Sequence, residues 1–171
     1  ADTQRDIQLG KEWGLHKEAK IMVIPGAGGI TMEKLDAEIL DPDLPEALPP
    51  GPIIVNPRGN RPGSLRQDIF FQAIKYFTQS ETNGVFICPS LQGDVQYQKL
   101  ITKLDIQERV YLWPKLTQKQ LWYLFSKSSV YASPSIHDGT PNSMLEAMAL
   151  GCFPVTGNIE SMKEWIVDGE N

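Results

Sequence analysis

From residue 52 onward, short apolar runs alternate with longer amphipathic ones, and this alternation constrains the fold more than any other feature. The apolar runs are rich in β-branched and aromatic residues and predict strands at 52–58, 84–90, 109–114, 130–135 and 152–157. The amphipathic runs predict helices at 64–80, 94–104, 117–128, 141–150 and 161–169. Short apolar strands joined by helices indicate a parallel sheet that is covered on both faces. We therefore expect a doubly wound, Rossmann-like α/β domain.

Two of the helices carry further signals. Thr117 precedes the helix at 117–128 and is a suitable N-cap residue. In the helix at 64–80, apolar residues recur at the spacing of one helix face. The residues of this expected buried stripe are Leu65, Ile69, Phe70, Ala73 and Phe77.

The first part of the chain does not share the alternation. Residues 3–13 predict a helix and residues 20–26 a strand, whereas the five prolines within 41–52 indicate a linker or surface loop. We expect residues 1–45 to be a leading helix–strand remnant and linker, and residues 46–171 to be the Rossmann-like domain. Both ends of the chain are interpreted as cuts in a longer protein.

A glycine-rich segment at 23–30 resembles a dinucleotide-binding fingerprint only in part. Its first two glycines fit, but Thr31 stands where the last glycine is needed, and no second strand follows. We interpret the segment as a turn at the end of a strand.

Composition excludes several classes of protein. A net charge of −5 argues against a nucleic-acid binder, which needs a basic face to neutralise phosphates. No apolar run approaches the ~18 residues that predict a membrane span. Cys88 and Cys152 lie in apolar, strand-like contexts and show no metal-ligand spacing, so we expect two reduced, buried thiols and a cytoplasmic location.

The segment HDGTPNSMLEAMALG, residues 137–151, holds the start of a helix that follows a predicted strand. Thr140 is a suitable N-cap, and Pro141 is favoured at the first helical position. The backbone amides of Asn142, Ser143 and Met144 would then be free at the positive end of the helix dipole. Such amides form an anion site of the size of a phosphate, although many helix starts merely meet water.

Two carboxylates accompany this helix start. Glu146 has no Lys or Arg three or four positions away and lies among apolar neighbours, so we expect it to be buried and in need of a partner. The hydroxyl pair of a ribose would supply one. Asp138, in the preceding loop, would reach a second part of the same ligand. The neighbouring His137 is either an exposed loop residue or a hydrogen-bonding partner of a sugar or phosphate.

The loop NPRGNRPGSLR, residues 56–66, follows the first strand of the alternation and contains Arg58, Arg61 and Arg66. In a parallel sheet this loop opens onto the ligand crevice. Arginine suits phosphate because its planar, always charged group can donate two parallel hydrogen bonds. The three arginines are therefore either phosphate ligands or solvated loop residues.

Residues 131–171 resemble the signature region of the retaining glycosyltransferases of family four, which include the glycogen-synthase-like and sucrose-synthase-like enzymes. Seven residues lie between the acidic positions Asp138 and Glu146, as in the family pattern, and a Pro, the run LEAMALG and a Pro-Val pair follow in the family's order. The likeness extends more weakly to residues 109–135 and to 20–30.

The resemblance implies a role for each matching residue. Glu146 would bind the ribose hydroxyls of the donor, and Asp138, where the family has Glu, would contact the transferred sugar, which makes these two the candidate catalytic residues. The segment Lys115–Leu116 would frame the base. The diphosphate would be held by Gly139, Thr140, Pro141, Asn142, Ser143 and Met144, together with Arg58 and Arg66.

The resemblance further implies that the chain is the C-terminal, donor-binding half of a glycosyltransferase of the two-domain GT-B architecture. The intact enzyme would transfer a glycosyl group from a nucleotide-diphosphate sugar to an acceptor hydroxyl with retention. Its partner would be an N-terminal acceptor domain, through which the enzyme is able to associate with membranes. Because arginines and helix amides would stabilise the departing diphosphate, we expect neither a cofactor nor a metal ion.

Two alternatives remain open from the sequence. One is a nucleotide-sugar epimerase of the same two-domain build. The other is a non-catalytic binding module, which is favoured by Asp138 in place of Glu and by an arginine loop without the family's usual Gly-Arg and Lys-Gly pairs.

Overall fold

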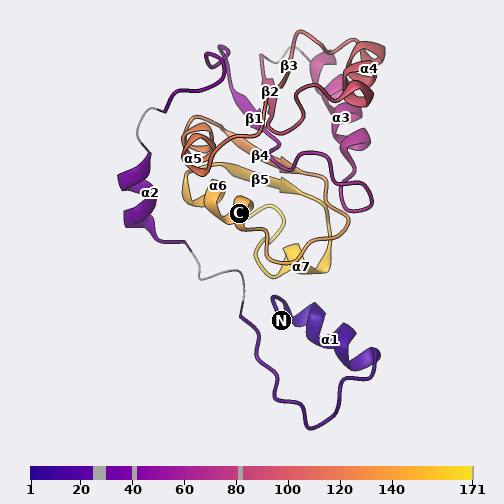
Figure 1. The fold of residues 1–171 in the computed structure, drawn as a ribbon. Helices are drawn as coiled ribbons and strands as arrows, with labels where there is room; N and C mark the ends of the chain where they lie inside the picture. The colour runs from indigo at the N-terminus through magenta and orange to yellow at the C-terminus, as the bar shows by residue number, and fades with distance from the viewer. Residues whose placement is uncertain (25–29, 40–41, 81–82, 171) are drawn as a thin grey trace.

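A computed structural model describes residues 1–24, 30–39, 42–80 and 83–170. Within them lies a parallel five-stranded sheet in the order β3-β2-β1-β4-β5, so the predicted doubly wound, Rossmann-like α/β fold is confirmed (Figure 1). The strands are β1 (Ile53–Val55), β2 (Val85–Cys88), β3 (Val110–Leu112), β4 (Val130–Ser133) and β5 (Phe153–Thr156). β1 pairs with β2 on one side and with β4 on the other. The strand order therefore reverses between β1 and β4.

The helices are α1 (Gln4–Glu12), α2 (Met32–Glu38), α3 (Gln67–Gln79), α4 (Val95–Leu104), α5 (Gln118–Ser126), α6 (Asn142–Ala149) and α7 (Glu160–Lys163), and all but α1 pack on the sheet. α3 and α4 pack on one face, and α2, α5, α6 and α7 on the other. The side chain of Thr117 accepts from the amide of Gln120 and caps α5, as predicted. α7 is shorter than the predicted helix at 161–169, because the chain turns after Lys163.

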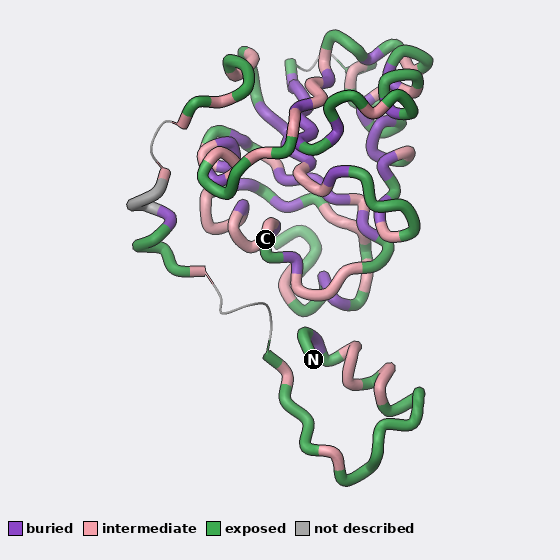
Figure 2. The backbone as a smooth tube through the Cα atoms, in the orientation of Figure 1, coloured by how far each residue is buried: buried purple, intermediate pink, exposed green. Residues whose placement is uncertain are grey.

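The core has two halves because successive strand residues point to opposite faces. Ile53 and Val55 face the side of α5 and α6, where they pack with Trp113 and Phe125. Ile54 faces α3 and α4 on the other side. Figure 2 shows the buried residues concentrated along the strands and the helices beside them.

α3 buries a different face from the one expected. Its buried residues are Gln67, Phe70, Phe71 and Ile74. Leu65 and Phe70 of the expected stripe are buried, but Ile69 and Phe77 are 44% and 37% exposed, so that prediction was right only in part. The error has a physical cause: the buried series begins at a polar residue, Gln67, which a search for apolar spacing passes over.

The prediction that both faces of the sheet are covered fails at β5. Phe153 and Val155 are more than half exposed, on the face opposite α6 and α7. α3 and α4 lie over β1, β2 and β3 and do not reach this edge strand (Figure 1).

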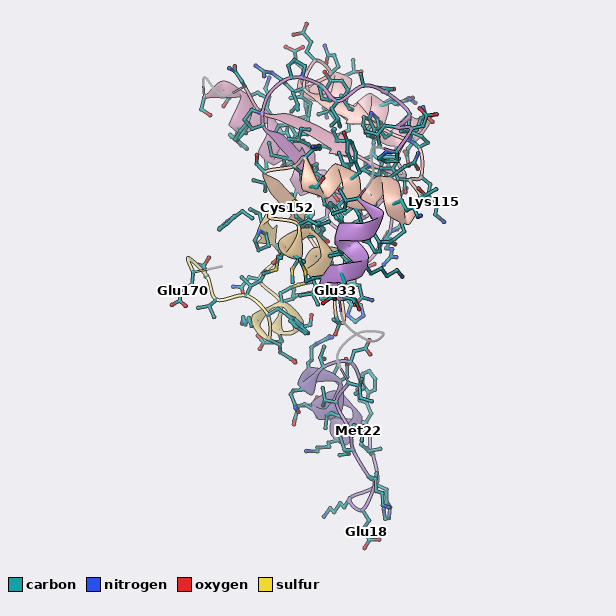
Figure 3. The ribbon with its side chains drawn as sticks, turned by 90° about the vertical axis from the view of Figure 1, so that its left-hand side faces the viewer. Glu18, Met22, Glu33, Lys115, Cys152 and Glu170 are labelled. Atoms are coloured by element: carbon teal, nitrogen blue, oxygen red, sulfur yellow. The ribbon has the colours of Figure 1, made fainter. Side chains whose placement is uncertain are left out.

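The leading part of the chain forms an arm. α1 is present as predicted, with a capping box between Thr3 and Asp6. The strand expected at 20–26 is absent over 20–24, where the amide of Ile24 instead donates to the carbonyl of Ala1 at 2.9 Å. The rest of that strand and most of the glycine-rich segment lie outside the described residues. Figure 3 shows Glu18 and Met22 on the arm, below the main body.

α2 connects this leading part to the main body. Leu35 is 1% exposed and packs in the core half that contains α5. The ammonium nitrogen of Lys34 lies 5.8 Å from the centre of the Trp122 ring, a cation–π contact between α2 and α5. The domain boundary near residue 45 stays a prediction.

Both cysteines are free and buried, which confirms that part of the sequence interpretation. Burial raises the pKa of the Cys152 thiol to about 11 and raises that of Cys88 as well. Among the described residues, no helix combines the length and the apolar character that a membrane crossing requires.

Gly157, at the carboxyl end of β5, has the closest backbone neighbour among the described glycines. A Cβ atom there would lie 1.9 Å from the carbonyl oxygen of Ser135. We expect Gly157→Ala to lower the free energy of unfolding by about 2 kcal/mol, because the backbone must move apart. Urea unfolding monitored by circular dichroism measures the change. Gly10→Ala is the matched control, since its new methyl group meets only Leu15 at 3.6 Å. Equal stability of the two variants would contradict the prediction.

Candidate functional site

The loops that follow β1 and β4 meet where the strand order reverses. Residues 56–66 and 134–141 run side by side, and an antiparallel bridge joins Leu65 to Ser135. Backbone hydrogen bonds on either side of the bridge hold the two loops together. Ligands of open α/β sheets bind in the crevice at such a reversal. The structure therefore brings the two segments that the sequence marked as functional to one place.

An ion pair between Arg58 and Asp138 spans the two loops. The side chains are only 11% and 14% exposed, and Nη2 of Arg58 donates to Oδ2 of Asp138. The other carboxylate oxygen accepts from the amide of Gly139 at 3.1 Å. Nε of Arg58 is buried and has no partner in the described part of the chain. The guanidinium thus keeps donor capacity, whereas both oxygens of Asp138 are engaged.

A buried pair of side-chain amides supports the loop that carries Arg58. Asn56 donates to Gln67 at 2.7 Å, and Gln67 donates to the carbonyl of Gly59 at 2.8 Å. The carbonyl oxygen of the Asn56 side chain accepts from the amide of Arg58 at 3.3 Å. Neither residue was expected at the site. The available signal was their position, one directly after a strand and one at the start of a helix.

Tyr131 adds a buried hydroxyl beneath the ion pair. Its oxygen lies 3.1 Å from Oγ of Ser143, at the start of α6. Burial raises the pKa of Tyr131, and the positive charge of Arg58 partly opposes this rise. Sequence reasoning treated Tyr131 only as part of a strand.

The start of α6 differs from the prediction. The N-cap residue is Pro141, whose ψ of 81° is not helical, so the helix begins one residue later than expected. Thr140 does not cap it, because its hydroxyl points to the carbonyl of Asp2 at 3.4 Å. The leading arm thus touches the loop that was expected to hold a diphosphate.

Two of the three helix-start amides expected to be free are engaged. The amide of Asn142 donates to the carbonyl of Thr140 at 3.1 Å, and that of Met144 to the carbonyl of Pro141 at 2.8 Å. Only the amide of Ser143 keeps no acceptor among the described residues. The anion site at this helix start is therefore narrower than predicted.

Glu146 is neither buried nor without a partner, so that expectation was wrong. Its side chain is partly exposed, and Oε2 accepts from Nε2 of Gln118 at 2.8 Å. α6 buries only Met144 and Ala147, which face the sheet. Glu146 instead faces the start of α5, and Gln118 is a second residue that the sequence did not indicate.

The two residues expected to frame a base, Lys115 and Leu116, lie in different environments. Lys115 follows β3 and is exposed at the rim of the main body, beside α5 (Figure 3). Leu116 is half-buried and packs against the core.

Of the other sequence candidates, Arg66 is not presented to the reversal point. Its guanidinium forms two parallel hydrogen bonds with Asp68, at 2.9 and 2.8 Å, on the surface. These bonds raise the pKa of Arg66 and lower that of Asp68. Arg61 and His137 are exposed. In the described ranges, no three His, Cys, Asp or Glu side chains gather closely enough to hold a metal ion.

Residues 66–171 match the family of glycosyl transferases group 1. The chain belongs to this family. No curated protein matches the chain by sequence. The match includes Asp138, Glu146 and Gln118 but starts after Arg58, so only the tertiary contact connects that arginine with the family's segment.

Several solved structures share the fold of this chain. HepE of Anabaena, in complex with UDP and glucose, has a TM-score of 0.74 at 16% identity, over 99% of this chain and 46% of that one. A TarM mutant of S. aureus, in complex with fondaparinux, alpha-GlcNAc-glycerol and UDP, has a TM-score of 0.72 at 16% identity, over 97% and 31%. The pneumococcal O-GlcNAc transferase GtfA, in complex with UDP and GlcNAc, has a TM-score of 0.66 at 16% identity, over 100% and 32%.

The present chain spans less than half the length of each of these structures. At this level of identity the likeness establishes the fold alone. The chain therefore shares the Rossmann-like fold of part of each of these structures.

The Arg58–Asp138 ion pair should contribute to the stability of the folded chain. We expect Asp138→Asn to lower the free energy of unfolding by about 2 kcal/mol, because Arg58 would keep a nearly buried charge without its counter-charge. Asp68→Asn is the control: it breaks an equally well-formed pair on the surface, and solvent compensates there. Urea denaturation of both variants at pH 7 measures the contrast. Similar stabilities would show that the Arg58–Asp138 pair is not structural.

Proposed function

We propose that the chain is the donor-binding half of a glycosyltransferase, which transfers a sugar from a nucleotide-diphosphate sugar to an acceptor hydroxyl with retention. One observation carries the proposal. Arg58 meets Asp138 of the family segment at the reversal between β1 and β4, where α/β sheets bind ligands.

Arg58 is the proposed ligand of the diphosphate. Its guanidinium contributes one nitrogen to Asp138 and keeps Nε unpaired, and this buried donor would engage a phosphate oxygen after the side chain moves. The amide of Ser143 is a second donor close to the same loops. We propose that these groups stabilise the departing diphosphate without a metal ion or cofactor. Asp138 limits the positive charge that the ligand meets, and it contacts the transferred sugar.

The nucleoside would bind where α6 faces the start of α5. Glu146 binds the ribose hydroxyls in this proposal, with the base beside Lys115 and Leu116. The acceptor would be bound by a further, N-terminal domain, which is supported by the short span of this chain relative to the solved structures. The two free, buried thiols support a cytoplasmic location.

Binding of nucleotide sugars tests the proposal directly. We expect UDP-, GDP- or ADP-sugar to bind the chain with a dissociation constant below about 1 mM, a modest affinity because half of the two-domain cleft is absent. Isothermal titration calorimetry with each nucleotide sugar measures it. The chain alone should not transfer sugar. Failure of all three to bind would favour a non-catalytic module instead.

The ribose assignment has its own test. Glu146→Gln should weaken the preferred nucleotide about tenfold, because a hydrogen bond to a charged acceptor becomes a neutral one. The affinity of deoxyribose nucleotides should change little in this variant, so the preference for ribose over deoxyribose should become smaller. Glu160→Gln is the control: this exposed carboxylate pairs with Lys163 on α7. An unchanged affinity in Glu146→Gln would refute the role of Glu146.

A further inference from the structure

A hydrogen bond between Gln118 and Glu146 connects two elements that the proposed function uses separately. Nε2 of Gln118 donates to Oε2 of Glu146 at 2.8 Å, across 28 residues of sequence. Gln118 is the first residue of α5, and Glu146 lies one turn inside α6. Both side chains remain accessible to solvent.

The backbone of Gln118 is firmly placed. It follows Thr117, whose side chain forms a reciprocal capping box with Gln120. The side chain of Gln120 also donates to the carbonyl of Asp43 at 2.6 Å and so ties the start of α5 to the preceding linker. The capping box and the bond to Asp43 thus fix the backbone at the start of α5, and only the side chain of Gln118 remains free to rotate.

The bond to Glu146 also orients the Gln118 amide. Because Nε2 points to the carboxylate, the carbonyl oxygen on the same carbon must point elsewhere. That oxygen accepts no hydrogen bond within the described ranges, and neither does Oε1 of Glu146. Each side chain of the pair therefore keeps one acceptor oxygen without a bond, neutral on Gln118 and charged on Glu146.

One unbonded acceptor on each of two bonded side chains would suit the two neighbouring hydroxyl donors of a ribose. The position of the pair agrees with this match. Gln118 lies three residues after Lys115, in the segment expected to frame the base, and it touches Glu146, the expected ribose ligand. Gln118 therefore lies between the residues proposed to bind the base and the residue proposed to bind the ribose.

We propose that Gln118 is a nucleoside-binding residue that shares the ribose with Glu146. Glu146 accepts one ribose hydroxyl through Oε1, and Gln118 accepts the other through its carbonyl oxygen. The bond between them holds the two side chains together. This inference rests on the proposed function, because it presupposes a nucleotide donor.

Removing one ribose hydroxyl at a time tests whether Gln118 and Glu146 each bind a different hydroxyl. The probes are UDP, GDP and ADP with their 2′-deoxy and 3′-deoxy forms, titrated calorimetrically into the wild-type chain, Gln118→Ala and Gln118→Met. For the diphosphate that binds most tightly, both variants should bind about fivefold more weakly, the effect of one neutral hydrogen bond. In the variants, one of the two deoxy forms should bind as well as its parent, whereas the other should still bind more weakly.

Two controls separate binding from folding. Gln107→Met changes another exposed glutamine, which bonds Asp105 at the amino end of β3, and should leave all affinities unchanged. Inorganic pyrophosphate, which has no ribose, should bind the wild type and the Gln118 variants equally. An equal loss for pyrophosphate would mean that the substitution disturbs the site as a whole, and would overturn the inference.

The remaining outcomes separate a failure of the Gln118 role from a failure of the proposed donor site. If the wild-type chain binds a nucleoside diphosphate and Gln118→Ala keeps full discrimination against both deoxy forms, Glu146 holds the ribose alone and only this inference fails. If the wild type binds none of the three diphosphates, the proposed donor site fails and this inference fails with it.

Discussion

The pairing of β1 with both β2 and β4 is the constraint on which the rest of the structure depends. It makes β1 the central strand and forces the chain to reverse its direction of travel across the sheet after β3. The loops after β1 and β4 must then leave the same edge as neighbours. The Arg58–Asp138 ion pair and the backbone bonds between these loops follow from that adjacency. A nearly buried ion pair is stable only if both partners stay in place, so the pair in turn restricts how the two loops can move.

The site built on this edge has two parts that differ in chemistry. Around Arg58 it is nearly buried and balanced in charge, with Asp138, Tyr131 and Ser143 within one cluster. Around Glu146 it is open and held by a single bond to Gln118. A nucleotide sugar would place its diphosphate against the first part and its nucleoside against the second. The connection between them is α6, whose inward side chains fix it to the sheet while its outward side chains remain available.

Several parts of this arrangement were accessible from the sequence and others were not. The alternation of apolar and amphipathic runs was sufficient for the five strands and the parallel sheet, because burial on two faces leaves a continuous apolar signal. The buried face of α3 was missed because it starts with Gln67, whose burial depends on the distant Asn56. The expected isolation of Glu146 was wrong for a similar reason, since its partner lies on another helix. Arg66 was taken as a phosphate ligand, but Asp68, two residues away, engages it on the surface.

The sequence by itself determined the fold class, the family and the identity of the polar residues at the carboxyl edge of the sheet. These are local properties, which periodicity and motif order record directly. Only the tertiary structure decided which of those residues meet: Arg58 with Asp138, and Glu146 with Gln118. It also decided that Thr140 turns towards the leading arm and that most of the amides at the start of α6 are engaged. The physical reason is that the partner of a charged or polar side chain is chosen by proximity in space, and proximity here is set by strand order.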